Sequence, residues 1–311
     1  MHAAASLVLT LLLGVVVAQE LHSLGWGFNE MRPSPGISEA QKARIQQAIN
    51  AHLKTTLNQS SHIRSKAKRF TSSFTAPLRA PAALLAEQPG GFHYISAYAD
   101  HNSASGASKD YSCGTRSRDN HAGTDFVLAP FPFYFLASSS PTYQVEVIAV
   151  QPGQVVYTQT AFADNHCACI NTDANVVAVL HSDGSAALYG HFKKNSIVVS
   201  VGSTVARGQK LGIVGSSGCS TGPHLHLEVY SDWNVQGSSI DPFLGPCNPN
   251  MTYQWWNKQP QDPKQPSILT IATMTVSPTF DFCCTSGLAT CTEAHAYDTL
   301  LSSGLCFKIV I

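Results

Sequence analysis

The chain has 311 residues, of which 12% are charged, and its 19 Lys and Arg balance 19 Asp and Glu. Soluble domains usually carry about 25% charged residues, so here Ser, Thr, Asn and Gln supply much of the polarity. Residues 19–90 hold nine basic and four acidic residues, whereas residues 91–311 hold ten and fifteen. Because the larger part has no basic excess and no nucleic-acid-binding motif, the sequence argues against DNA or RNA as a partner.

The first eighteen residues form an apolar run that ends in Val16-Val17-Ala18. This pattern is typical of a secretory signal peptide with a small-residue cleavage site, although the start lacks Lys and Arg. The run is shorter than the roughly 20 residues that span a bilayer, and no later segment is apolar enough to do so. We therefore expect residues 1–18 to be removed and the product to be secreted or periplasmic, with no integral membrane span, and monomeric.

The segment 37–55 has the pattern of an amphipathic helix, with Ile45, Ile49 and Leu53 on one stripe. Ser38 is the expected N-cap, and Gln41, three residues on, is its expected capping-box partner. The sequence predicts a single helix without a domain around it.

Residues 61–85 are rich in Ser, Ala, Pro and basic residues, which indicates a linker rather than a packed unit. Within it, Lys66-Ala67-Lys68-Arg69 is a basic site that a processing protease could cut, which would make residues 19–69 a pro-segment. An exposed basic linker that is never cut is the alternative.

From Phe92 to about Cys247 the pattern is a succession of short β-branched and aromatic runs, each closed by Gly, Asn, Asp, Ser or Pro. Short connections favour antiparallel neighbours, so the sequence predicts a mainly β fold built on an antiparallel sheet. The expected strands are 92–98, 124–129, 143–150, 153–160, 175–180, 186–192, 196–201, 209–215 and 224–230.

Residues 248–311 contain four cysteines and two strand-like runs, 268–276 and 306–311. This pattern predicts a small β module that depends on disulfides. The aromatic segment that leads into it, with Tyr253, Trp255 and Trp256, either stacks on sugars or packs the tail against the preceding domain, and packing is the favoured reading.

All nine cysteines follow the signal peptide, and in an oxidising compartment they allow at most four disulfides and one thiol. Their spacing matches no structural zinc site, so we expect disulfides rather than a second metal. The four that fall in predicted loops of the β domain are candidates for one or two bridges at the rim of the site, with partners left open: Cys113, Cys167, Cys169 and Cys219.

Five residues suggest metal chemistry. His121 and Asp125 lie four residues apart, and His224 and His226 alternate along a predicted strand, so both imidazoles point to one face. His191 stands at the end of another predicted strand. Imidazole nitrogens combined with a carboxylate oxygen suit zinc. Each feature alone is common. The inference of a metal site therefore depends on their order along the chain, with Gly-rich turns between them.

In these residues the chain resembles the lysostaphin-type (LytM-like) zinc metalloendopeptidases, whose hallmark is His-x-x-x-Asp followed far downstream by His-x-His. The likeness covers about residues 91–231. It implies that residues 91–247 form an antiparallel catalytic domain with a narrow groove. It also implies one Zn²⁺ per chain held by His121, Asp125 and His226, with His191 and His224 catalytic; which of the two is the general base stays open. His101 and His166 fall outside the motif and are expected at the surface.

The resemblance further implies hydrolysis of peptide bonds in bacterial peptidoglycan, in stem peptides or cross-bridges, by zinc-activated water. A noncatalytic wall-binding or activator module is one alternative, and a zinc endopeptidase acting on Gly-rich proteins is another. Some relatives are kept latent by a pro-segment, and the basic leader before Phe70 is a candidate for that role.

Overall fold

The computed structural model describes residues 36–57, 74–87, 91–128, 143–163, 173–220, 222–232, 239–249, 251, 255–260, 270–274 and 306–310. Several sequence predictions lie outside these residues or their described side chains, namely the signal peptide, the basic site at 66–69, the side chain of Leu53, His166, Tyr253, and Cys167, Cys169, Cys283, Cys284, Cys291 and Cys306. Within the described part of the chain, no helix has both the length and the apolar character needed to cross a membrane.

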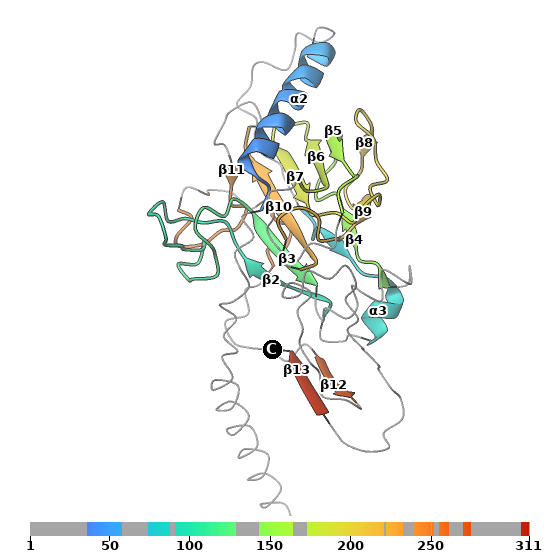
Figure 1. Cartoon of the computed structure of the whole chain (residues 1–311). Helices are drawn as coiled ribbons and strands as arrows, with labels where there is room; N and C mark the ends of the chain where they lie inside the picture. Colours follow the sequence, from blue (N-terminus) through green and yellow to red (C-terminus); the bar gives the residue numbers. More distant parts are fainter. Residues whose placement is uncertain are drawn as a thin grey trace, which may run out of the picture. The chain divides into compact units, whose positions relative to one another are not determined.

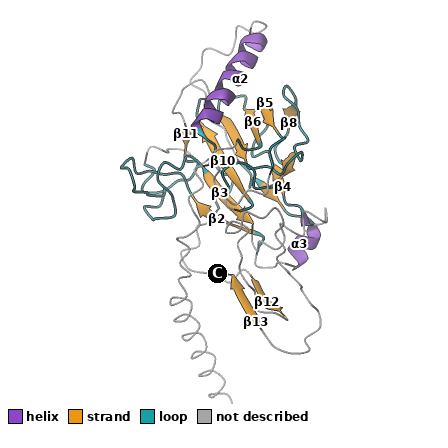
Figure 2. Cartoon of the chain, in the orientation of Figure 1, coloured by secondary structure: helices purple, strands orange, loops and turns teal. Residues whose placement is uncertain are grey.

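The main element is an antiparallel sheet of eight strands (Figures 1 and 2). Its order is β2 (His93–Ala97), β3 (Thr124–Leu128), β10 (His224–Tyr230), β7 (Ala186–Gly190), β6 (Val176–Leu180), β5 (Gly153–Gln159) and β8 (Thr204–Val205), with β11 (Ser239–Ile240) paired to β10. This confirms the predicted mainly β, antiparallel fold.

A second, three-stranded sheet consists of β1 (Leu78–Arg79), β4 (Glu146–Ile148) and β9 (Lys210–Ile213). Its buried side chains join those of one face of the main sheet in a single apolar cluster, to which β10 contributes Leu225, Leu227 and Val229. Because side chains alternate along a strand, the other face of β10 carries His224, His226 and Glu228.

The helix α2 (Glu39–Leu57) covers part of this second face. Ile45 and Ile49 are fully buried in a cluster with side chains of β5, β6 and β7. The Gln41 backbone N–H donates to Ser38 Oγ at 3.1 Å, which confirms the N-cap. The prediction of a helix with no domain around it is wrong, because its apolar stripe is buried against the sheet.

Gln41 does not complete a capping box with its side chain. Its amide instead pairs with the backbone of Ala174, donating to the carbonyl at 2.7 Å and accepting from the N–H at 2.9 Å. This long-range pair ties α2 to the residues that precede β6.

Residues 74–87, predicted as part of a linker, are packed. They contain β1 and the short helix α3 (Ala82–Glu87), and Phe74 is fully buried between Trp255 and Trp256, with ring centroids 5.2 and 5.6 Å away. The linker interpretation is wrong here. The segment is rich in Ala and Pro, but three of its apolar side chains, those of Phe74, Leu78 and Leu84, are buried in the core.

Trp255 and Trp256 are 0% and 2% exposed. Trp256 also contacts Phe126 and Phe243, with centroids 6.4 and 5.3 Å apart. Their burial in the core supports packing and leaves neither ring available to stack on a sugar.

One predicted strand does not form. Residues 196–201 run beside β9 with a backbone hydrogen bond from Val198 N–H to the Leu211 carbonyl at 2.9 Å, but they join no ladder. Val198 and Val201 are 63% and 49% exposed. The β-branched side chains in this segment led to the prediction of a strand. That preference is local and does not show whether a neighbouring strand is available for pairing.

In the C-terminal region, β12 (Thr270–Met274) and β13 (Cys306–Val310) form an antiparallel pair. Both lie within the two predicted strand-like runs.

A disulfide joins Cys113 to Cys247, with the Cα atoms 5.1 Å apart. It links the long loop before β3 to the segment after β11. Cys219 is also disulfide-bonded. Of the four loop cysteines expected in bridges, the structure describes Cys113 and Cys219, and both are bridged.

Candidate metal centre

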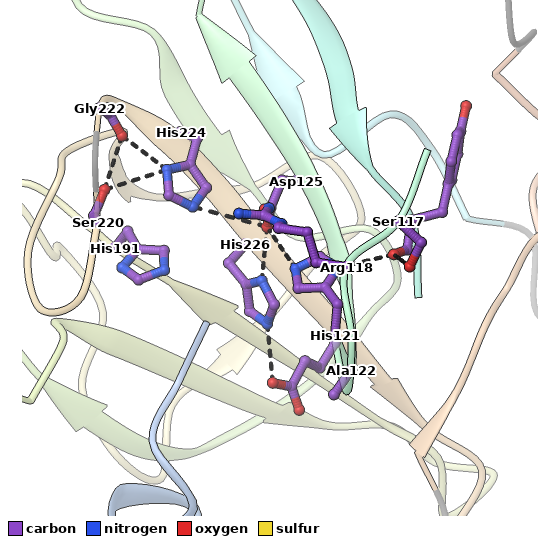
Figure 3. A network of polar contacts seen from close by, with 12 residues as sticks. Ser117, Arg118, His121, Ala122, Asp125, His191, Ser220, Gly222, His224 and His226 are labelled. Carbon is purple, nitrogen blue, oxygen red and sulfur yellow. Dashed lines mark hydrogen bonds and ion pairs between the residues drawn. The ribbon is translucent and has the colours of Figure 1, made fainter. Parts of the chain in front are cut away.

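The pairing of three strands places the predicted site residues together. On β10, His226 lies opposite Asp125 of β3 and opposite Gly190 of β7. His224, two residues earlier, points to the same face, and His191 directly follows β7. His121 lies just before β3. Figure 3 shows the four histidines and Asp125 on one side of the sheet.

His121, Asp125 and His226 offer one ligand atom each, and these atoms lie within 4.8 Å of one another. Asp125 Oδ1 is 2.7 Å from His226 Nδ1 and 3.2 Å from His121 Nε2. All three residues are buried.

The outer nitrogen of two rings is hydrogen-bonded. His121 Nδ1 is 2.8 Å from the Tyr98 carbonyl, which only accepts, so the neutral ring carries its proton on Nδ1 and a lone pair on Nε2. His226 lies between two carboxylates, Glu228 at Nε2 and Asp125 at Nδ1, and its neutral ring has one proton to donate. A cation bound to Asp125 Oδ1 would leave that proton on Nε2 and the lone pair on Nδ1.

Two ring nitrogens and a carboxylate oxygen thus converge, and a cation among them would accept a lone pair from each. His121 Nε2 is buried and has no hydrogen-bond partner among the described residues. Two nitrogens and one oxygen match the ligand sets of catalytic zinc sites. The residues therefore fit a metal ion.

His191 and His224 lie beside this cluster, with ring centroids 4.4 Å apart. Their Nδ1 atoms are 2.6 and 2.8 Å from the carbonyls of Ser217 and Gly222, so the neutral rings carry their protons there. Both Nε2 atoms are buried without a partner in the described structure. His224 Nε2 lies 3.7 Å from Asp125 Oδ1, which places it next to the candidate ligands.

Burial sets the protonation of these rings. It lowers the pKa of His121 and His191 well below the usual value, and that of His224 to about 3. At neutral pH the imidazoles are therefore uncharged and have a lone pair for a metal or a proton.

His191 has a φ of 66°, in the left-handed region that non-glycine residues rarely adopt. Its carbonyl accepts a hydrogen bond from Gly215 N–H at 2.9 Å, which helps to hold this conformation. Such strained residues cluster at functional sites.

Two charged residues at the site were missed by the sequence predictions. Arg118 donates to Asp125 Oδ2, so the ligand candidate is held through its second oxygen. Glu228 is fully buried and bonded to His226. The alternation along β10 places Glu228 on the face of His226 and could have revealed it, whereas no periodic signal marks Arg118 in its loop.

The segment that leads into α2 lies against His226. A Cβ atom at Gly36, whose φ is +72°, would come within 2.7 Å of His226 Cε1, and one at Gly123 within 2.9 Å of the same atom. A Cβ atom at Gly190 would likewise come within 2.7 Å of Ile37 Cδ1. His191, His224 and His226 are only 0%, 5% and 0% exposed.

His101 is not part of this cluster. Its Nε2 lies 2.9 Å from Asp241 Oδ2. It is partly buried rather than a free surface residue.

Comparison with known proteins gives matches that cover parts of the chain. The chain is 42% identical to murein hydrolase activator EnvC of Escherichia coli over 67 residues. This matched stretch covers 22% of this chain and 15% of EnvC. Over 68 residues it is 37% identical to DD-carboxypeptidase/endopeptidase Mpg of Neisseria meningitidis, which is 22% of this chain and 14% of Mpg. The chain thus spans a small part of the length of these relatives.

Among solved structures, the catalytic domain of lysostaphin from Staphylococcus simulans is similar at 21% identity and a TM-score of 0.30, covering 53% of this chain and 96% of that domain.

Residues 137–242 match the family described as Peptidase family M23. The matched range contains His191, His224 and His226, and it begins after His121 and Asp125. Over this range the β domain is therefore similar to peptidase family M23.

Proposed function

We propose that this chain is a secreted zinc metalloendopeptidase that hydrolyses peptide bonds in the stem peptides or cross-bridges of bacterial peptidoglycan. The observation that carries the proposal is the convergence of His121, Asp125 and His226, with the unpartnered Nε2 atoms of His191 and His224 beside them. The substrate class is supported by similarity to Mpg, a DD-carboxypeptidase/endopeptidase, and to a peptidoglycan DD-endopeptidase of Vibrio cholerae.

In this proposal His121, Asp125 and His226 hold the zinc. When bound, zinc supplies a Lewis acid and lowers the pKa of a water ligand to about 7. Three protein ligands leave a coordination position open, as catalytic sites require.

His191 and His224 supply the proton transfers. Each is neutral at pH 7 and has its Nδ1 proton fixed on a carbonyl, so Nε2 is the atom that accepts a proton from the attacking water. A protonated ring can then stabilise the oxyanion or donate to the leaving amine. Both residues can serve either step.

We propose also that the leader keeps the enzyme latent. A polymer substrate needs an open site, yet the residues at the centre are nearly inaccessible and Gly36 and Ile37 pack onto them. In this scheme residues 1–18 are the signal peptide and cleavage near Arg69 frees residues 19–69. The catalytic domain extends beyond the expected 91–247, because residues 74–87, Trp255 and Trp256 pack in its core, and the Cys-rich module follows them.

The test is to measure zinc per chain and then digest purified peptidoglycans of different cross-bridge types with the full chain and with a form that begins at Phe70. Released peptides are identified by mass spectrometry, with and without a chelator. We expect about one zinc per chain and chelator-sensitive cleavage that rises when the leader is removed.

Failure to cleave any wall type by the zinc-loaded form that begins at Phe70 would rule out the main proposal. Wall binding without zinc or cleavage would indicate an activator, the role named for EnvC. Cleavage of a Gly-rich protein with intact walls left uncut would indicate a protein endopeptidase. Equal activity with and without the leader would rule out latency.

A further inference from the structure

Glu228 is a buried carboxylate to which the proposed reaction assigns no role. It follows His226 by two residues on β10, so both side chains point to the metal-centre face of the sheet. Its side chain is 0% exposed. A buried carboxylate is costly unless it is hydrogen-bonded and its charge is compensated, so its contacts indicate what it does.

Three groups donate to this carboxylate. His226 Nε2 and Lys42 Nζ both lie 2.9 Å from Oε1, and the Tyr230 hydroxyl donates to Oε2. Both oxygens are therefore engaged, which restricts rotation of the carboxylate. Lys42 is a cation and the Tyr230 hydroxyl donates, so the carboxylate is the acceptor in these contacts.

The two nitrogens of His226 face two carboxylates. Glu228 Oε1 lies 2.9 Å from Nε2, and Asp125 Oδ1 lies 2.7 Å from Nδ1. A proton on Nε2, accepted by Glu228, leaves the lone pair on Nδ1 for a cation beside Asp125. The ring itself fits between Gly36 and Gly123, where a Cβ atom would collide with it, and this close packing limits its rotation.

We propose that Glu228 is a positioning residue that holds His226 as an Nδ1 metal ligand and thereby sets the metal affinity of the centre. The inference rests on the proposed function, since it assumes that His226 binds zinc. A carboxylate that accepts from the far nitrogen of a ligand histidine orients the ring and makes it a stronger ligand.

Lys42 provides the matched control. It contacts the same oxygen of Glu228 as His226 does but comes from α2, and among the described residues its ion pairs are with Glu39 and Glu228 and not with the three candidate ligands. A substitution at Lys42 removes charge compensation and a link to α2, while the Glu228–His226 hydrogen bond stays. If Glu228 acts on His226, the Glu228 and Lys42 variants must therefore differ.

The experiment uses the full chain loaded with Zn²⁺ and measures how much zinc each variant retains against a graded series of chelators. We expect Glu228→Ala to bind zinc about 10- to 100-fold more weakly than the unsubstituted chain. Glu228→Gln should lose less, because its amide carbonyl accepts the same hydrogen bond without the charge. Lys42→Met should bind zinc as tightly as the unsubstituted chain.

A second measurement is the ¹⁵N NMR spectrum of the imidazoles after zinc has been removed. We expect His226 to be protonated on Nε2 in the unsubstituted chain and in Lys42→Met, and on Nδ1 in Glu228→Ala, where Asp125 is the remaining acceptor. The conservative Gln variant keeps the experiment valid if the Ala variant is unstable, and thermal unfolding of each variant checks the fold.

The outcomes separate the two levels of the proposal. If the unsubstituted chain binds no zinc, the proposed function fails and the inference fails with it. If that chain binds zinc but Glu228→Ala and Glu228→Gln bind it as tightly, only the positioning role is overturned. An equal loss in Lys42→Met would also overturn it, because charge balance or the leader contact would then explain the effect.

Discussion

At the scale of single residues, each histidine of the centre is held through one ring nitrogen, which leaves the other for chemistry. His121, His191 and His224 use Nδ1 on backbone carbonyls, whereas His226 uses Nε2 on the Glu228 carboxylate. Backbone acceptors are fixed by the fold itself. The acceptor at His226 is a side chain, so a single substitution at Glu228 could change how this candidate ligand is held.

The division between ligand and proton carrier predicts different results for the two histidines of β10. His226→Ala should lose zinc, since it removes one of three protein ligands. His224→Ala should keep zinc and lose turnover by about 10²- to 10⁴-fold, the usual contribution of an acid or base. Zinc content and release of peptides from peptidoglycan by the processed enzyme check both, and loss of metal from His224→Ala would contradict the assignment.

A second residue-scale prediction concerns His93 on β2. Burial lowers the pKa of His93 to about 4, and its Nδ1 has no partner among the described residues. Its pKa in the unfolded chain is about 6.5. Above pH 6.5 neither state binds the proton, so stability is fully present; as the pH falls toward 4 the unfolded chain is protonated first and stability is lost.

The expected loss from His93 is up to about 1.4 kcal/mol per pH unit in this window. His93→Phe, which keeps an aromatic ring beside Phe92 and Phe126, should reduce the difference in free energy of unfolding between pH 7 and pH 5. Urea unfolding at the two pH values measures it. A variant with an unchanged pH dependence would show that His93 does not titrate in this way.

The site could be predicted from sequence only where a local pattern existed. Strand alternation placed His224 and His226 on one face, and the same rule applies to Glu228. That His121 and Asp125 would meet this strand followed from resemblance and not from spacing, because their approach depends on the pairing of β3 with β10. The contact of Gly36 with His226 joins segments far apart in the chain and left no local signal.

At the scale of elements, the stripe of α2 predicted the helix but not the face that it covers. Its apolar residues pack on β5, β6 and β7, the strands beside the metal centre. Residues 196–201 show the reverse error, because a strand signal was present without a partner strand. Both cases share a cause: hydrophobic periodicity reports local geometry, while the partner is set by the whole fold.

The packing of α2 predicts how the proposed latency can be relieved without cleavage. Ile49→Ala removes a fully buried side chain between α2 and the sheet and should cost about 2–5 kcal/mol of local packing. Part of the population should then have α2 detached. We expect faster proteolysis of the leader and higher peptidase activity from the uncleaved chain.

Gln47→Ala is the control for this experiment, because Gln47 is an exposed residue of α2. It should change neither rate. If Ile49→Ala accelerates proteolysis but leaves the activity of the uncleaved chain unchanged, α2 is not what closes the site.

At the scale of the whole molecule, the loop that carries His121 is joined to the segment after β11 by several links. The Cys113–Cys247 disulfide is one. Cys247 N–H also donates to the Tyr111 carbonyl at 2.9 Å, and His101 pairs with Asp241. The disulfide therefore reinforces a contact that other groups also make.

This redundancy predicts that the disulfide affects stability more than the site. It closes a loop with a sequence separation of 134 residues, so its main effect is to restrict the unfolded chain. A Cys113→Ser, Cys247→Ser double variant should lose about 2–5 kcal/mol of unfolding free energy. Its zinc affinity at low temperature should stay unchanged, because the native contacts remain.

The double variant is preferable to a reducing agent, because Cys219 is also disulfide-bonded and would be reduced as well. Denaturant unfolding and chelator competition on the same preparation measure the two quantities. If the double variant is fully folded but binds zinc more weakly than the unsubstituted chain, the disulfide positions His121 directly. An unchanged unfolding free energy would mean that the unfolded chain already holds these two segments together.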